Sequence, residues 1–163
     1  MAKRPGSAAT PALTALAAAG IEHRVHEYVH DPAVSSYGDE AVAALGVDPA
    51  AVFKTLVITD GTRFGVALVP VAARLSLKAA GAALGMHRPA LADPADVTRV
   101  TGYVLGGVSP VGQRRRLATV VDESAARHPT VYCSAGRRGL EIELAPADLL
   151  AATGASTAPL TAG

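Results

Sequence analysis

The sequence predicts a single mixed α/β (α+β) domain, with helices around strands that cluster in the middle and at the end of the chain. Its 163 residues are the length of one domain. Half of them are hydrophobic, which is enough to build a core without disulfides or a structural metal. Helix and strand patterns do not alternate regularly, so a parallel sheet built from βαβ units is not expected.

The folded part of the chain is expected to span residues 10–153. Residues 1–9 precede the first helix signal and are expected to form a flexible leader. Residues 154–163 are small, polar or alanine, which is typical of a frayed tail. Neither a repeat nor a change of composition divides the sequence, so no second domain is predicted.

Helix starts are indicated at pairs such as Thr10-Pro11 and Asp93-Pro94, where a capping residue precedes a proline suited to the first helical turn. Most of these segments end at a glycine, which can adopt the left-handed backbone that terminates a helix. The expected helices span residues 10–19, 36–46, 75–84, 93–102 and 145–152, with a short helical turn at 48–49.

The clearest strand signal is a hairpin at Asp60-Gly61, because this pair between two β-rich runs favours a tight turn. Those runs are residues 53–59 and 63–70. Shorter strands are expected at residues 24–29, 119–122, 130–134 and 140–144.

The overall charge and aromatic content argue against several classes of nucleic-acid protein. Lys and Arg total 15 against 14 Asp and Glu, so the net charge of +1 is unlike that of a protein that coats nucleic acid non-specifically. With no Trp, two Phe and four Tyr, an aromatic stacking platform is not expected. A near-neutral sum still permits local basic patches.

No apolar run in the sequence is long enough to cross a bilayer, and the alanine-rich residues 12–20 lack the order of a signal peptide. We therefore expect a cytoplasmic protein without membrane contact. The single cysteine, Cys133, excludes an internal disulfide. It lies in an apolar run and is expected to be a small buried hydrophobe rather than a nucleophile.

Familiar catalytic templates do not fit this sequence. Ser109 is followed by Pro110, which lacks the N–H that the oxyanion hole of a nucleophile elbow requires. No G-x-G-x-x-G or Walker motif is present, so no cofactor is expected. On a strand, His23 and His26 would point to opposite faces, so a metal site is not expected there.

Two features suggest chemistry. Lys54 and Thr55 lie where a strand begins, although a lysine in such a place is often only solvated. A glycine-rich segment, 102–112, indicates either tight turns or a backbone that approaches a ligand closely. Three arginines, 114–116, follow it and form either a solvated face or a grip for phosphates.

Taken together, these segments resemble the YbaK/EbsC family of free-standing Cys-tRNA(Pro) deacylases, which is related to the editing domain of prolyl-tRNA synthetases. The resemblance covers roughly Thr10 to Ala152, and the matching segments occur in the family's order. They are YVHDP at 28–32, YGDE at 37–40, FKTL at 53–56, TGYVLGGVSP at 101–110 and SAGRRGLEIEL at 134–144. Many relatives have Phe at Tyr37, a small aliphatic residue at Cys133, Gly at Ala135 and Asp at Glu141.

The resemblance implies a compact domain with a curved mixed sheet surrounded by helices, and an enzyme that cleaves the ester between a wrong amino acid and the tRNA 3′ end. It implies that Lys54 is the catalytic residue. The substrate-binding residues that it implies are Tyr28, Tyr37, Thr55, Gly102, Gly106, Gly107, Ser109, Pro110, Ser134 and Glu141. We expect local positive charge for tRNA at Arg114, Arg115, Arg116, Arg137 and Arg138.

The implied partner is tRNA(Pro) charged with cysteine, and prolyl-tRNA synthetase is a further candidate. Proline and cysteine are close in size, so a separate editing step is useful. The implied mechanism is attack by the thiol of the misattached cysteine on its own ester. Two alternatives stay open: an Ala-tRNA(Pro) deacylase of the same fold, and a non-catalytic module that binds tRNA or a synthetase.

Overall fold

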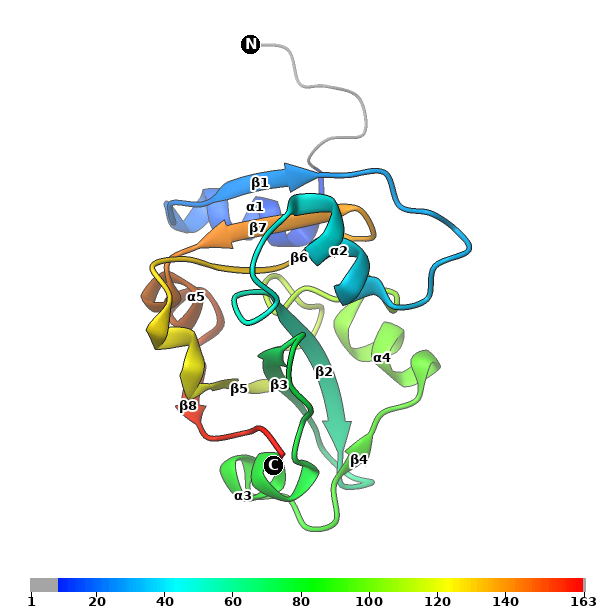
Figure 1. The fold of residues 1–163 in the computed structure, drawn as a ribbon. Coiled ribbons are helices and arrows are strands. Elements are labelled where there is room, and N and C mark those ends of the chain that lie inside the picture. Colours follow the sequence, from blue (N-terminus) through cyan, green and yellow to red (C-terminus); the bar gives the residue numbers. More distant parts are fainter. Residues whose placement is uncertain (1–8, 163) are drawn as a thin grey trace.

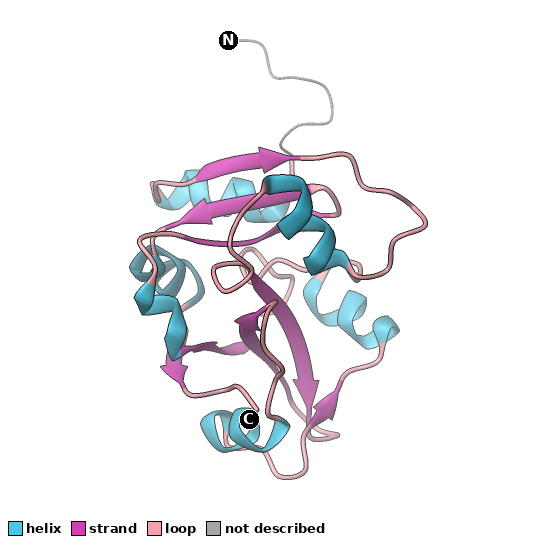
Figure 2. Ribbon diagram, in the orientation of Figure 1, coloured by secondary structure: helices cyan, strands magenta, loops and turns pink. Residues whose placement is uncertain are grey.

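Two sheets form the framework of the domain (Figures 1 and 2). The computed structural model describes residues 9–162. The smaller sheet is antiparallel and has the order β1-β7-β6, with β1 Arg24–Glu27, β7 Leu140–Leu144 and β6 Val131–Arg137. The larger sheet is mixed and has the order β4-β2-β3-β5-β8. Its strands are β4 Ala90–Leu91, β2 Phe53–Thr59, β3 Phe64–Pro70, β5 Ala118–Asp122 and β8 Ser156–Ala158.

The predicted mixed domain with helices around its strands is confirmed, and its strands divide between these two sheets. The sheets meet where β2 begins, because Val52 forms a bridge with Tyr132 and the Tyr132 N–H donates to the Ala51 carbonyl at 2.9 Å. The start of β2 therefore lies at the junction of the two sheets, beside β6.

Five α-helices in residues 9–162 surround the sheets, and each ends at a glycine with left-handed backbone. Four of these glycine ends were predicted, and the end of the last helix at Gly154 was not. They are α1 Pro11–Ala19, α2 Tyr37–Leu45, α3 Leu77–Leu84, α4 Pro94–Thr101 and α5 Pro146–Thr153. The Thr10 hydroxyl caps α1 by accepting from the Leu13 N–H, and it donates to the Ala135 carbonyl at 2.6 Å, which fixes α1 against β6. The expected helical turn at 48–49 is an irregular turn, and a 3-10 helix at Glu123–Arg127 was not predicted.

The predicted hairpin joins β2 to β3, which pair from Phe53 opposite Pro70 to Thr59 opposite Phe64. The Asp60 carboxylate accepts from the backbone N–H groups of Thr62 and Arg63, and this closes the turn. The hydrogen bonds from Arg63 and Thr62 lower the pKa of the Asp60 carboxyl, against a smaller opposing effect of burial.

The expectation of a frayed tail over 154–163 is wrong for the residues described. Ser156–Ala158 form β8, which pairs in parallel with β5. The Leu160 side chain is fully buried, and the Leu160 N–H donates to the Asp122 carboxylate at 2.8 Å. The small and polar residues of this segment gave no strand signal, so no strand was predicted here. The segment is ordered by pairing and burial rather than by its own propensity. The expected leader at 1–9 lies outside the described residues except for Ala9, which is exposed.

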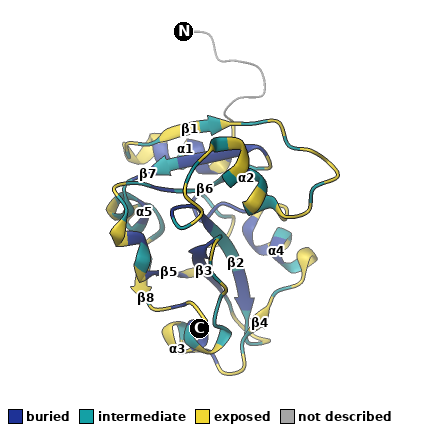
Figure 3. Ribbon diagram, viewed as in Figure 1, coloured by how far each residue is buried: buried dark blue, intermediate teal, exposed yellow. Residues whose placement is uncertain are grey.

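The core has two parts, on the two faces of the larger sheet (Figure 3). Successive residues of β3 alternate between them: Val66 and Leu68 pack in the larger cluster, and Ala67 and Val69 pack in the smaller one. The larger cluster also holds residues of both strands β6 and β7, so it fills the space between the sheets. No helix in the described part of the chain has the length and apolarity needed to cross a membrane.

Candidate active site

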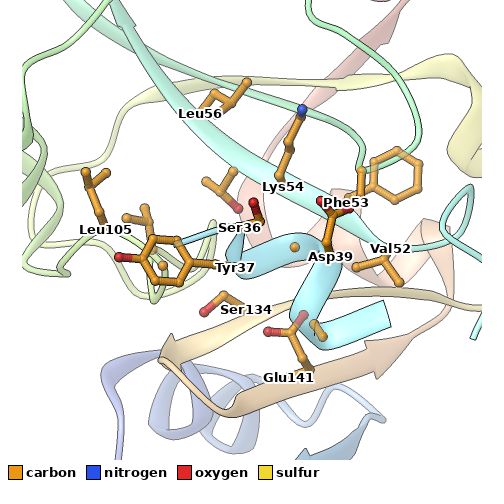
Figure 4. Close-up of a pocket in the computed structure, with 16 residues that line it drawn as sticks. Ser36, Tyr37, Asp39, Val52, Phe53, Lys54, Leu56, Leu105, Ser134 and Glu141 are labelled. Carbon is orange, nitrogen blue, oxygen red and sulfur yellow. The ribbon is translucent and has the colours of Figure 1, made fainter. Parts of the chain in front are cut away.

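A pocket of about 400 Å³ lies where the two sheets meet (Figure 4). Strands β2, β6 and β7 supply one side of it, and the start of α2 and the glycine-rich segment supply the other. The residues that line it are Ser36, Tyr37, Gly38, Asp39, Ala41, Val52, Phe53, Lys54, Thr55, Leu56, Val71, Leu105, Gly106, Val108, Ser134 and Glu141.

Lys54, which the family resemblance implies is catalytic, lines this pocket. Its neighbour Phe53 is 2% exposed and belongs to the main core, which anchors the start of β2. Lys54 itself is half-buried, and it forms no ion pair or hydrogen bond with any side chain in residues 9–162. An ammonium without an internal partner is available to bind an acceptor on a ligand.

Glu141 lies on β7, opposite Ser134 of β6 in the register of the smaller sheet. It is 6% exposed and has no hydrogen-bond or ion-pair partner for its carboxyl group in the described part of the chain. Burial raises the pKa of this carboxyl to about 8, so the neutral acid dominates at pH 7. Glu141 can therefore donate a hydrogen bond to a ligand as well as accept one.

The hydroxyl groups of Thr55 and Ser134, both in the pocket lining, differ in whether they have a hydrogen-bond partner. The Oγ1 of Thr55 is buried and has no hydrogen-bond partner among the described residues. The Ser134 hydroxyl accepts from the Gly136 N–H at 3.2 Å. Since buried polar atoms are nearly always paired in native proteins, the Thr55 hydroxyl indicates a place for a ligand atom.

Tyr28 borders the site without lining the pocket. Burial raises its pKa to about 12, and the nearby carboxyl groups of Glu141 and Glu40 add to that rise. The phenol therefore stays protonated at physiological pH.

The glycine-rich segment contributes only part of its length to the pocket, through Leu105, Gly106 and Val108. Gly106 has φ +85°, and a Cβ on it would lie 2.7 Å from Cδ1 of Tyr37. Gly106 is thus required by its close contact with Tyr37 within the protein, and the approach of this backbone to a ligand stays a prediction.

Other residues predicted on this segment lie behind the pocket wall. Gly102 terminates α4, and a Cβ on Gly107 would lie 2.6 Å from the Arg137 Cα. Ser109 is fully buried, with its hydroxyl accepting from the Val111 N–H, and Pro110 is buried beside it. These four residues do not line the pocket, and they support the segment that does.

The predicted basic residues fall into two groups. Arg114–Arg116 are exposed and lie outside the pocket lining. The Arg114 N–H donates to the Thr101 carbonyl and its Nη1 to the Arg99 carbonyl at 3.3 Å, so this arginine also closes the C-terminal end of α4. Arg138 and Arg137 lie at the end of β6, where Arg137 pairs with Glu27 at 3.1 Å.

The histidines and the cysteine are not placed for catalysis in this pocket. His26 pairs with Glu143 at 2.8 Å and His30 with Glu40 at 2.6 Å. No cluster of metal-ligating side chains occurs in residues 9–162. Cys133 is fully buried, and burial raises the pKa of its thiol well above the ordinary value, which confirms it as a buried hydrophobe.

Several lining residues were not predicted from the sequence. Ser36 and Asp39 belong to the first turn of α2, and Val71 follows the end of β3. A Cβ on Gly38 would lie 2.7 Å from a methyl group of Val71, so these two segments are in direct contact. The acidic first turn of α2 was a usable signal, whereas the contact with Val71 depends on the fold.

Comparison with known proteins identifies the family. A model of the aminoacyl-tRNA editing domain matches residues 30–152. EbsC of Enterococcus faecalis, whose name describes a Cys-tRNA(Pro)/Cys-tRNA(Cys) deacylase, is 38% identical over 125 residues, which cover 75% of this chain and 76% of that protein.

Solved structures agree with this match. A crystal structure named for a trans-editing enzyme for prolyl-tRNA synthetase has a TM-score of 0.84 and 31% identity, and the match covers 96% of this chain and 100% of that one. A crystal structure of a hypothetical protein has a TM-score of 0.84 and 28% identity over 94% of this chain and 100% of that one. The resemblance found in the sequence is therefore confirmed, and the chain belongs to the family of aminoacyl-tRNA editing domains.

Proposed function

We propose that this protein is an aminoacyl-tRNA deacylase that removes cysteine from misacylated Cys-tRNA(Pro). The observation that carries the proposal is the content of the pocket. It holds the unpaired ammonium of Lys54 and the unpartnered hydroxyl of Thr55, and its lining includes no cysteine or histidine. Such a pocket can bind and polarise an ester, but it lacks an activated nucleophile of the Ser–His or Cys–His type.

The missing nucleophile comes from the substrate in this proposal. The thiol sulfur of the attached cysteine forms a bond to its own ester carbonyl carbon, and the bond from that carbon to the ribose oxygen breaks. The thiol loses its proton and the departing ribose oxygen takes one up, so the products are a cysteine thiolactone and the free tRNA 3′ end. Holding the thiol and the carbonyl in one conformation is then the main task of the pocket.

Each polar group of the pocket has a role in that step. The Lys54 ammonium stabilises negative charge that develops on the ester or holds the terminal ribose. The Gly106 N–H makes no hydrogen bond with the described residues and lies on the pocket wall, so it can serve as a further donor to the carbonyl oxygen. Neutral Glu141 and the Thr55 hydroxyl orient the aminoacyl group from the side of the sheets.

The tRNA itself binds outside the pocket in this proposal, and the exposed arginines 114–116 are the candidates for phosphate contacts. Reversing the charge of Arg114 and Arg115 should raise KM for the charged tRNA, with the larger effect at low salt. An unchanged KM would mean that these arginines do not contact the tRNA phosphates, and that the Arg114 side chain serves only to close the end of α4.

The decisive experiment compares tRNA(Pro) charged with cysteine, alanine or proline. Alanine lacks only the sulfur of cysteine, so it isolates the contribution of the substrate thiol. We expect rapid loss of cysteine and little loss of alanine or proline. Equal cleavage of Ala-tRNA(Pro) would exclude attack by the substrate thiol, and tRNA binding without any cleavage would identify a binding module. Adding prolyl-tRNA synthetase to the same assay tests whether it is a partner.

A further inference from the structure

Three segments that are far apart in the sequence meet at the outer side of the pocket, and two of them line it. Tyr37 begins α2, Leu105 and Gly106 belong to the glycine-rich segment, and Arg138 follows β6. Tyr37 and Leu105 both line the pocket, and Figure 4 shows them on the same side of it. We call Tyr37, Leu105 and Gly106 the outer wall.

Arg138 contacts both other segments of this outer wall. The carbon at the centre of its guanidinium group lies 4.7 Å from the centroid of the Tyr37 ring, a cation–π arrangement. Its Nε–H donates to the Leu105 carbonyl at 2.9 Å. The guanidinium group therefore lies over the tyrosine ring while its Nε–H bonds to the glycine-rich segment.

Gly106 and Gly107 pack so closely against the neighbouring segments that neither position has space for a side chain. A Cβ on Gly106 would lie 2.7 Å from the Tyr37 ring and 2.9 Å from the Arg138 Nε. Behind it, a Cβ on Gly107 would lie 2.6 Å from the Arg137 Cα. The glycine-rich segment is thus pressed between α2 and the end of β6, and Arg138 closes the contact.

Tyr37 also has an aromatic neighbour, His30. The His30 ring centroid lies 5.8 Å from that of Tyr37, and His30 is held by its 2.6 Å contact with Glu40 of α2. The tyrosine is the element through which Arg138 can act on the pocket, since Arg138 itself is not part of the lining.

We propose that Arg138 is a positioning residue that holds the outer wall in place by joining Tyr37 to the Leu105 carbonyl. This inference rests on the proposed function and differs from the tRNA contact that the sequence predicted for Arg138. A phosphate contact needs only positive charge, whereas the outer wall needs a planar group that can stack and donate at the same time. Lysine supplies the first and not the second.

The test compares Arg138→Ala and Arg138→Lys with a matched control, Arg127→Ala, which removes an exposed arginine of the 3-10 helix that does not line the pocket. Hydrogen–deuterium exchange of residues 104–107 is the first readout, because the Gly107 N–H bonds to the Val104 carbonyl within this segment. We expect faster exchange there in both Arg138 variants and no change in the control. Unchanged exchange in both Arg138 variants would overturn the proposal, whether or not the protein cleaves any tRNA.

Kinetics with Cys-tRNA(Pro) give the second readout. We expect kcat to fall about tenfold or more in both Arg138 variants, because a misplaced wall misorients the reacting group, while KM and its dependence on salt stay close to wild type. Recovery of kcat in Arg138→Lys, or a raised KM with a weaker salt dependence and normal kcat, would instead identify a phosphate contact. A wild-type protein inactive on all charged tRNAs would reject the proposed function and leave the exchange result to decide on Arg138.

If Arg138→Ala fails to fold, a double-mutant cycle on Arg138→Lys and Tyr37→Leu answers the same question. The two changes break one contact, so their effects on kcat should not add. Additive effects would show that Arg138 and Tyr37 act independently and would refute the proposal.

Discussion

The two sides of the pocket are built differently. The inner side, formed by Lys54, Thr55, Ser134 and Glu141, lies on paired strands whose neighbouring residues belong to the core. The outer wall lies on a helix start and a loop, and exposed Arg138 joins its parts. Strands fix side-chain positions more rigidly than loops do, so in the proposed function the inner side holds the reacting groups, and the position of the outer wall depends on contacts such as those of Arg138.

The largest effect should come from the inner side. Lys54→Ala removes the only ammonium in the pocket lining, and we expect deacylation of Cys-tRNA(Pro) to fall by at least about a hundredfold. The fold should be unaffected, because the Lys54 ammonium has no partner among the described residues. Lys78→Ala, which changes an exposed residue of α3 outside the pocket lining, is the control and should retain full activity. Near-normal activity of Lys54→Ala would remove the lysine from the mechanism.

On the outer wall, Gly106→Ala tests how tightly the wall is packed. The new methyl group would meet the Tyr37 ring, so we expect a loss of activity of about tenfold and destabilisation of about 1–3 kcal/mol. Gly20→Ala has a similar left-handed backbone and open space around it, and it should cost stability without affecting activity. If both variants keep full activity, the wall is more tolerant than the geometry indicates. Kinetics and thermal melting measure the two effects.

Glu141→Gln tests the inner side of the pocket through the pH dependence of the free energy of unfolding. The folded pKa of about 8 lies above the ordinary value of 4.5, so the stability due to this group is fully present below pH 4.5 and is lost as pH rises to 8. In that window, wild type should lose about 1.4 kcal/mol per pH unit relative to Glu141→Gln, which does not titrate. Urea denaturation at several pH values measures this difference.

The control for Glu141 is Glu143, two residues along the same strand. The Thr130 hydroxyl lowers the pKa of Glu143, with a further contribution from His26. Stability due to Glu143 is therefore present above its ordinary pKa and is lost as pH falls, which is the opposite sign. Parallel curves for wild type and Glu141→Gln would mean that the Glu141 carboxyl is solvated.

The smallest effect on activity should come from Cys133→Ala, behind the inner side. Deacylation should be unchanged, since the thiol is buried and protonated. Stability should fall by about 1–2 kcal/mol because a small cavity forms in the core. Loss of turnover at full stability would make Cys133 a nucleophile and contradict attack by the substrate thiol.

The same division explains what could be predicted from the sequence. Caps, glycine stops and the Asp60-Gly61 turn are local signals, so the helices and the hairpin were predicted correctly. Lys54 was assigned to the candidate site from the FKTL segment, through the family resemblance. The contact of Arg138 with the Tyr37 ring could not be predicted from the sequence, because it joins segments whose proximity depends on the whole fold. Strand β8 was missed for the same reason, since it is ordered by pairing with β5.

The burial of Cys133 has a consequence for how the protein withstands its own chemistry. In the proposed mechanism, each turnover brings a substrate thiol to the enzyme and releases an acylating thiolactone. Thiol–disulfide exchange and S-acylation both require an accessible thiolate. The single cysteine of this chain is fully shielded and kept protonated, so the enzyme offers these products no sulfur with which to form a mixed disulfide or a dead-end thioester.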